Sequence, residues 1–139
     1  MTSAYMFKDA ITSVLAKIGL NVELWRGTPR RSSNLLEINT RPVSIVLYVK
    51  YSNSNPGFWG LTANQLDRLN NSRSKWYVVL LARSMSDGYL FNSADVNRMV
   101  SDGIFELGKD GDHKVNETTD CGSGHRFSGV KMLVDHITT

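Results

Sequence analysis

Two neighbouring apolar runs constrain the fold of this chain more than any other part of its sequence. They cover residues 35–38 and 43–51, and only residues 39–42 separate them. So short a polar connection predicts an antiparallel hairpin. The second run is apolar at nearly every position, which indicates a central strand covered on both faces. We therefore expect a sheet with a packing layer on each side.

The N-terminal segment is a candidate for one of these layers. Apolar side chains recur there at helical spacing, at Phe7, Ile11, Val14, Leu15 and Ile18. This pattern predicts a helix over residues 4–18 with one buried stripe. Gly19 follows where a residue in the left-handed conformation would end the helix.

The remaining segments add strands and helices around the hairpin. We expect strands at residues 21–25, 76–82, 88–91, 104–107 and 114–116, and helices at 63–70, 94–101 and 127–137. Thr62 and Gln65 have the spacing of a capping box, and Ser93 is the expected cap of the next helix. This order predicts an α/β (α+β) domain with a mixed central β-sheet flanked by helices.

Length and composition favour one domain. A chain of 139 residues, 41% of them hydrophobic, suffices for one hydrophobic core, so residues 1–139 are treated as a single domain. The sequence has no apolar run of about 18 residues and no secretory signal, which predicts an intracellular protein without membrane association. Cys121 is the only cysteine, which excludes an internal disulfide and a cysteine-based zinc site.

Charge is distributed unevenly along the chain. Residues 1–75 hold ten Lys or Arg and four Asp or Glu, a net charge of +6, whereas residues 76–139 hold six and nine, a net charge of −3. A one-sided positive field steers a protein toward polyphosphate, so the basic half is the candidate for a nucleic-acid interface. A basic surface that is merely solvated is the alternative interpretation.

Polar residues on and beside the hairpin form a pattern of their own. Asn34 precedes the first strand and Glu37 lies within it, while Tyr48 and Lys50 lie two positions apart on the second. Alternation along a strand places Tyr48 and Lys50 on one face. It places Glu37 on the opposite face from Asn34 unless a bulge intervenes. Asp9 lies in the first turns of the expected N-terminal helix.

The order of helix, strand, basic loop and two strands ending at Lys50 resembles the core of the PD-(D/E)XK nuclease superfamily, which includes restriction endonucleases and Holliday-junction resolvases. The resemblance covers residues 4–82 and implies a restriction-endonuclease-like core. Residues 83–139 would complete the sheet and add helices.

In that superfamily an acid near the start of the first helix, an Asp on the second strand and an (Asp/Glu)-x-Lys pair on the third converge on magnesium. Asp9 matches the helix acid, Asn34 stands where the Asp is commonest, and Tyr48-Val49-Lys50 replaces the acid-x-lysine pair. The candidate catalytic residues implied by the resemblance are Asp9, Asn34, Glu37, Tyr48 and Lys50.

Magnesium is the cofactor implied by this resemblance. Phosphodiester hydrolysis needs carboxylates to hold the ion and a lysine to stabilise the attacking group. Asp9 and a relocated Glu37 are the candidate metal ligands. Asn34 offers only a neutral amide oxygen, and Tyr48 offers only a neutral phenol.

Three functions follow as hypotheses. The first is a nucleic-acid-binding domain of nuclease-like fold, with a degenerate metal site and weak or no cleavage of its expected partner, DNA. Its candidate phosphate contacts are Arg26, Arg30, Arg31, Lys50 and Lys75. The second is an active Mg-dependent DNA endonuclease with relocated carboxylates. The third is a protein-interaction subunit of a larger complex, or a homodimer.

Aromatic and histidine residues leave further alternatives open. Phe58 and Trp59 follow a polar loop, where they could either stack on a base or pack against the next helix. His113, His125 and His136 match no metal-binding spacing, and we expect them at the surface.

Overall fold

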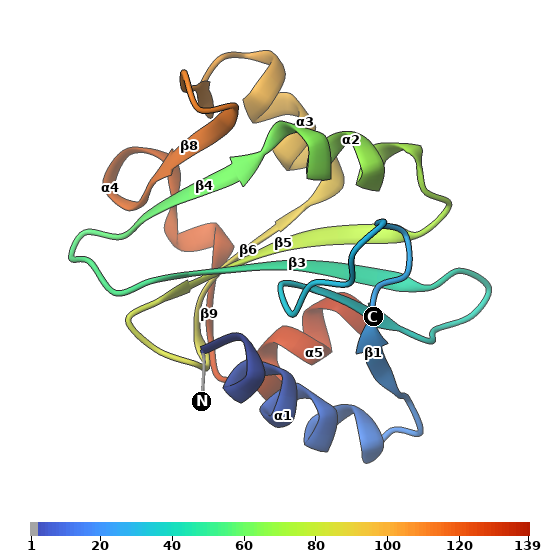
Figure 1. The fold of residues 1–139 in the computed structure, drawn as a ribbon. Helices are drawn as coiled ribbons and strands as arrows, with labels where there is room; N and C mark the ends of the chain where they lie inside the picture. Colours follow the sequence, from blue (N-terminus) through green and yellow to red (C-terminus); the bar gives the residue numbers. More distant parts are fainter. Residues whose placement is uncertain (1–2) are drawn as a thin grey trace.

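The computed structural model describes residues 3–139 (Figure 1). The described residues form a six-stranded main sheet in the order β1-β2-β3-β5-β6-β9. The strands are β1 (Val22–Leu24), β2 (Leu35–Ile38), β3 (Ile45–Ser52), β5 (Lys75–Ala82), β6 (Asp87–Asn92) and β9 (Arg126–Ser128). Because β3 and β5 are parallel and the other pairs are antiparallel, the sheet is mixed, as predicted. The predicted hairpin is the β2–β3 pair.

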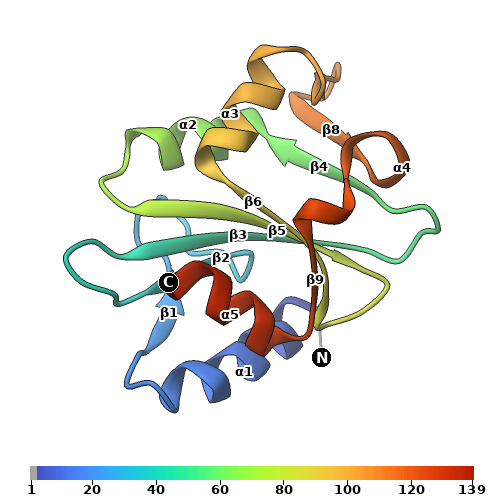
Figure 2. The ribbon, with the colours of Figure 1, turned by 180° about the vertical axis from the view of Figure 1, so that it is seen from behind.

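One face of the main sheet is covered by α1 (Ser3–Ala16) and α5 (Val130–Thr138), which lie together on that side in both ribbon views (Figures 1 and 2). Phe7, Ile11 and Leu15 from α1 are buried, and they share one cluster with Leu36 from β2. The predicted apolar stripe is therefore confirmed at these positions, but α1 ends at Ala16, and Ile18, which was predicted to belong to the stripe, is 54% exposed. Gly19, with a φ of 77°, adopts the expected left-handed conformation.

The opposite face carries a second layer of helices and strands. It contains α2 (Ala63–Asn71), α3 (Ser93–Ser101) and a second sheet in the order β4-β8-β7, with β4 (Phe58–Thr62), β8 (Asp112–Asn116) and β7 (Glu106–Leu107). The short helices α4 (Glu117–Asp120) and η1 (Ser123–His125) follow β8. The sequence predicted neither the β4 strand nor the separate sheet, because β4 pairs only with β8, at least 50 residues along the chain.

Two details of the predicted helix starts are wrong. The N-cap of α3 is Asn92, whose side chain accepts a hydrogen bond from the Asp95 N–H at 2.8 Å, and Ser93 is the first helical residue. The residues predicted as the start of the last helix instead form β9, which pairs with β6. Among the described residues, no helix is long and apolar enough to cross a bilayer.

Glu117 ties the two layers together. Its carboxylate accepts hydrogen bonds from the Gly57 N–H at 2.6 Å, from two Arg83 nitrogens at 2.8 and 2.9 Å, and from the Tyr89 hydroxyl at 2.6 Å. The Arg83 hydrogen bonds are the main cause that lowers the pKa of Glu117 to about 2. This single acid therefore joins the start of α4 to the β3–β4 loop, the end of β5 and β6.

Candidate nucleic-acid interface

Tyr48 and Lys50 lie on the face of β3 that meets the second layer. Tyr48 pairs with Leu35 of β2 and Val78 of β5, which belong to the same cluster of buried side chains. Tyr48 is only 3% exposed, whereas Lys50 is half-buried. The Lys50 ammonium lies 6.0 Å from the centroid of the Tyr48 ring. The predicted shared face is thus present, with the lysine ammonium near the buried aromatic ring.

The hydroxyl group of Tyr48 has a structural role. Its oxygen accepts a hydrogen bond from the Thr62 N–H at 3.2 Å, and the hydroxyl donates to Thr62 Oγ1 at 3.4 Å. Thr62 is the N-cap of α2, as predicted, but no side chain of the helix completes a capping box. Tyr48 takes the N–H that Gln65 was expected to bind. In the described part of the chain, Gln65 Oε1 is consequently buried without a hydrogen-bond partner.

Asn34 lies on the other side of the sheet. The Val49 N–H donates to the Asn34 carbonyl at 2.7 Å, which continues the β2–β3 ladder by one residue. Alternation then places the Asn34 side chain on the same face as Leu36 and Val49, both of which pack in the cluster beneath α1 and α5. Asp9 is exposed on α1 itself. Both residues are therefore separated from Tyr48 and Lys50 by the sheet.

Glu37 shares the face of Lys50 but lies farther along it. Its partner on β3 is Val46, four residues before Lys50, a separation of roughly 13 Å along the strand. Its partner on β1 is Glu23. The two carboxylates line a polar hollow of about 440 Å³ beside the β2–β3 hairpin.

These placements bear on the expected magnesium site. Asp9 and Glu37 lie on opposite sides of the main sheet, and Lys50 is remote from both. Within residues 3–139, no three His, Cys, Asp or Glu side chains form a group that could hold a metal ion. The residues expected as ligands therefore do not fit one shared ion.

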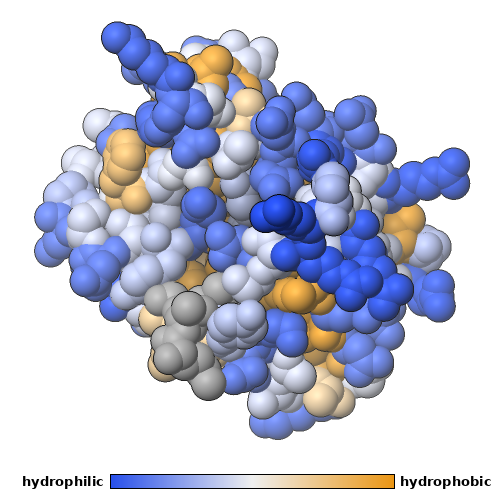
Figure 3. Space-filling model, in the orientation of Figure 1, coloured by the Kyte–Doolittle hydropathy of each residue, from blue (hydrophilic) through white to orange (hydrophobic). Residues whose placement is uncertain are grey.

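The β1–β2 loop carries three of the predicted phosphate contacts. Trp25, only 5% exposed, anchors the start of this loop in the core shared with α2. Gly27 packs against it so closely that a Cβ there would lie 2.2 Å from the indole ring. Beyond this anchor, Arg26, Arg30 and Arg31 are exposed. Figure 3 shows the most hydrophilic side chains of this view gathered over the region of the loop.

Ion pairing differs between the two halves of the chain. In residues 76–139 four of the six cations are paired with acids, namely Arg83, Arg98, Lys114 and Lys131. Among residues 3–75 the structure contains one ion pair, between Arg26 and Glu23 at 3.9 Å. The cations of the basic half are thus largely available to a ligand, while the acidic half neutralises its own.

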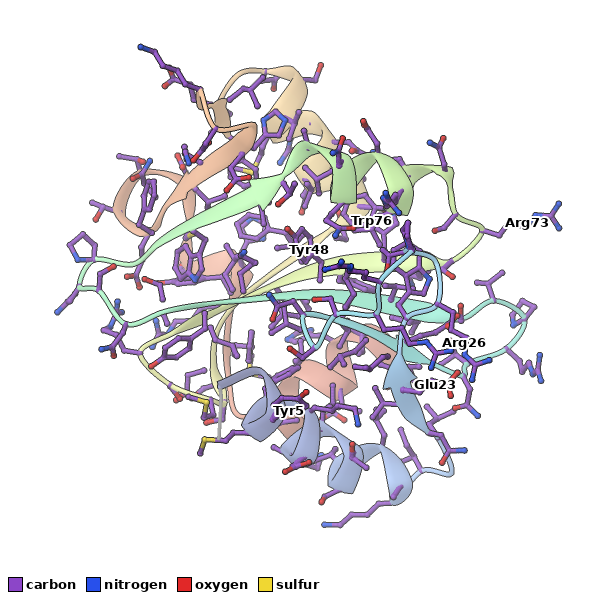
Figure 4. All side chains as sticks on the ribbon, in the orientation of Figure 1. Tyr5, Glu23, Arg26, Tyr48, Arg73 and Trp76 are labelled. Atoms are coloured by element: carbon purple, nitrogen blue, oxygen red, sulfur yellow. The ribbon has the colours of Figure 1, made fainter. Side chains whose placement is uncertain are left out.

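Other exposed cations of the basic half lie outside the β1–β2 loop. Lys75, at the start of β5, is exposed on the face of α5, with its ammonium 5.5 Å from the Tyr77 ring. Lys50 and Lys75 therefore project on opposite faces of the sheet. Arg41 and Arg73, which the sequence reasoning did not select, are exposed in the neighbouring turns. Figure 4 shows Arg26 and Arg73 on the same side of the molecule. The position of Arg41 and Arg73 in turns of the basic half was the sequence signal that could have identified them as candidate phosphate contacts.

Burial distinguishes the two aromatic residues and the three histidines. Trp59 is 2% exposed and donates its indole N–H to the Leu81 carbonyl at 3.2 Å, whereas Phe58 is 49% exposed. His125 is half-buried and stacks on Phe91, with 4.1 Å between ring centroids. His113 is also half-buried, so the surface position expected for the three histidines is confirmed only for His136, which is exposed.

Comparisons with known proteins support the fold. No protein-family model matches the chain, and no curated protein matches it. Among solved structures, the chain is similar to Hjc, a Holliday junction resolvase from the archaeal hyperthermophile Archaeoglobus fulgidus. The TM-score is 0.54 at 15% sequence identity, over 85% of this chain and 87% of that chain. The chain therefore has a nuclease-like fold of the restriction-endonuclease type.

Proposed function

We propose that the protein is a nucleic-acid-binding domain of nuclease-like fold, with DNA as its ligand and a degenerate active-site motif. The observation that carries this proposal is the set of unpaired cations in the basic half. Arg30, Arg31, Arg41, Arg73 and Lys75 are exposed, and none has an ion-pair partner among the described residues. Exposed, unpaired cations are the groups that neutralise backbone phosphates.

Phosphate contacts would begin at the β1–β2 loop. Arg26, Arg30 and Arg31 project from a segment that Trp25 anchors to the core, so their backbone positions are held in place without a ligand. A guanidinium binds two phosphate oxygens at once, which suits these residues to the role. Lys50 lies on the same sheet face and would add a contact deeper in the molecule. The similarity to a Holliday junction resolvase supports a DNA ligand.

Weak or absent cleavage belongs to the same proposal. Tyr48 stands in place of the motif acid and uses its hydroxyl on Thr62, while Asp9 and Glu37 are separated by the sheet. A plasmid-nicking assay with magnesium or manganese tests this part, with Lys50→Ala as the comparison. We expect no metal-dependent nicking in either protein. Nicking by the wild type that disappears in Lys50→Ala would instead establish the endonuclease alternative.

Binding itself is tested by fluorescence anisotropy with a labelled DNA duplex at low salt. The proposal requires measurable affinity that depends on the cations of the basic half. Failure to bind DNA at low salt would leave the protein-interaction alternative.

A further inference from the structure

The β2–β3 hairpin turn has an apolar tip in a basic surrounding. It extends beyond the end of the main sheet in both ribbon views (Figures 1 and 2). Val43 is 45% exposed at this turn, and the preceding Pro42 is exposed as well. Val43 and Pro42 together give the turn an apolar tip outside the two clusters of buried side chains.

The turn is held rigidly. Thr40 Oγ1 donates to the Val43 carbonyl at 2.7 Å across the turn. Ser44 Oγ and Ser74 Oγ are 2.7 Å apart, and the Lys75 N–H donates to the Ser44 carbonyl at 3.0 Å. Hydrogen bonds therefore connect the turn to the α2–β5 connection.

A hollow lies on each side of the turn. The larger, about 440 Å³, is on the face of Glu37 and Ser44. The smaller, about 250 Å³, is on the opposite face and is lined by Ile45 and Lys75. Arg41 lines both hollows. The tip thus separates two spaces that share one cationic side chain.

The charges around the tip suit a polyanion that carries hydrogen-bond donors. Arg41 and Lys75 line the hollows beside it, and the exposed Arg73 precedes Ser74, which contacts the turn, so that cations are available for phosphates near the tip. Glu23 and Glu37 would repel phosphate from the interior of the larger hollow. Carboxylates accept hydrogen bonds from the amino groups of bases, so this interior suits a base whose phosphate remains at the rim.

We propose that the tip formed by Pro42 and Val43 is a wedge that inserts at an unstacked base step of DNA, with the separated bases directed into the two hollows. The proposal rests on the proposed DNA-binding function and adds the class of ligand, DNA with a weakened step such as a single-nucleotide gap. Inserted apolar side chains, proline among them, are a general means of unstacking and kinking DNA. A gapped duplex has already lost part of the stacking that insertion must disrupt.

The test compares an intact duplex with a duplex carrying a one-nucleotide gap, each with 2-aminopurine at the central step. We expect the wild type to bind the gapped duplex on the order of tenfold more tightly and to raise its 2-aminopurine fluorescence at saturation. Val43→Ser should lose both the preference and the fluorescence rise while keeping its affinity for the intact duplex. The matched control is Ile104→Ser, which alters a residue of similar exposure, 47%, in the acidic half.

Urea unfolding of both variants verifies that they fold. Equal affinity of the wild type for the two duplexes, or a preference that survives in Val43→Ser, overturns the wedge while leaving DNA binding intact. Absence of binding to either duplex at low salt overturns both the wedge and the proposed function. The two failures are therefore distinguishable.

Discussion

The hydroxyl of Tyr48 accepts a hydrogen bond from the backbone N–H of Thr62 at 3.2 Å. Tyr48 lies two residues before Lys50 on β3, and Thr62 is the N-cap of α2. Tyr48 thus supports the junction between the main sheet and the second layer.

Replacing Tyr48 by phenylalanine should destabilise the fold. The change leaves the Thr62 N–H without its acceptor in a partly buried setting, and an unsatisfied buried donor typically costs about 1–3 kcal/mol. Urea unfolding monitored by tryptophan fluorescence measures this loss. DNA affinity of the folded variant should not change, because the phenol does not face the ligand.

The control for this variant is Tyr51→Phe. Tyr51 is 37% exposed, and its hydroxyl donates to Asn53 within an exposed loop at 3.3 Å. The free energy of unfolding of the Tyr51→Phe variant should stay within about 0.5 kcal/mol of the wild-type value. A Tyr48→Phe variant with unchanged stability would contradict the structural role.

Glu117 makes stability depend on acid pH. Its pKa is about 2 in the folded protein against an ordinary value of 4.5, mainly because Arg83 hydrogen-bonds the charged form. A lowered folded-state pKa means that the stabilisation is present above the unfolded pKa and is lost as pH falls. We therefore expect the free energy of unfolding to decline from about pH 5 toward pH 2.

Glu117→Gln should remove that part of the pH dependence. Losing the charge-assisted hydrogen bonds should also cost about 1.5–3 kcal/mol at neutral pH. Glu106→Gln alters an exposed acid and should leave both quantities unchanged. If the free energy of unfolding fell by the same amount in the wild type and in Glu117→Gln between about pH 5 and pH 2, the assignment of this pH dependence to Glu117 would be disproved.

Gly88 is required by the pairing of β5 and β6. A Cβ at this position would lie 1.9 Å from the backbone oxygen of Leu80, which cannot move without disturbing the sheet. Gly88→Ala should therefore lower the free energy of unfolding by about 1–3 kcal/mol or more. Gly122→Ala, where a Cβ meets nothing within 4 Å, is the control. Equal stability of the two variants would show that the strand register is different.

Arg30 and Arg31 are expected to contribute affinity without sequence preference. Replacing both by alanine should weaken binding to every duplex alike and reduce the slope of log affinity against log salt by about 2. Lys131→Ala is the matched control, because Lys131 is exposed but paired with Asp135 in the acidic half. An equal loss of affinity in the control would indicate that overall charge, not the loop, controls binding.

Local patterns predicted much of the architecture. The apolar runs of β2, β3 and β5 and the helical spacing of α1 each depend on neighbouring residues, and each is present near its predicted position. The second sheet could not be found in this way. Phe58 of β4 pairs with Asn116 of β8, and nothing near either residue indicates the other.

In the candidate site, too, features set by neighbouring residues were predicted and features set by distant contacts were not. Alternation along one strand correctly placed Tyr48 and Lys50 on a shared face. The relation between α1 and that face depends on which side of the sheet the helix covers, and this is decided by packing across the whole chain. Local sequence patterns therefore could not predict that Asp9 and Glu37 lie on opposite sides of the main sheet. They also could not predict that the Thr62 N–H donates to the Tyr48 hydroxyl.

The salt dependence of DNA binding tests the central claim most directly. Affinity of the wild type for one duplex would be measured by anisotropy between about 50 and 200 mM salt. If the unpaired cations of the basic half bind phosphates, log affinity should fall linearly with log salt, with a slope of about −0.9 for each phosphate contacted. A slope near zero, or no binding at the lowest salt, would contradict the account.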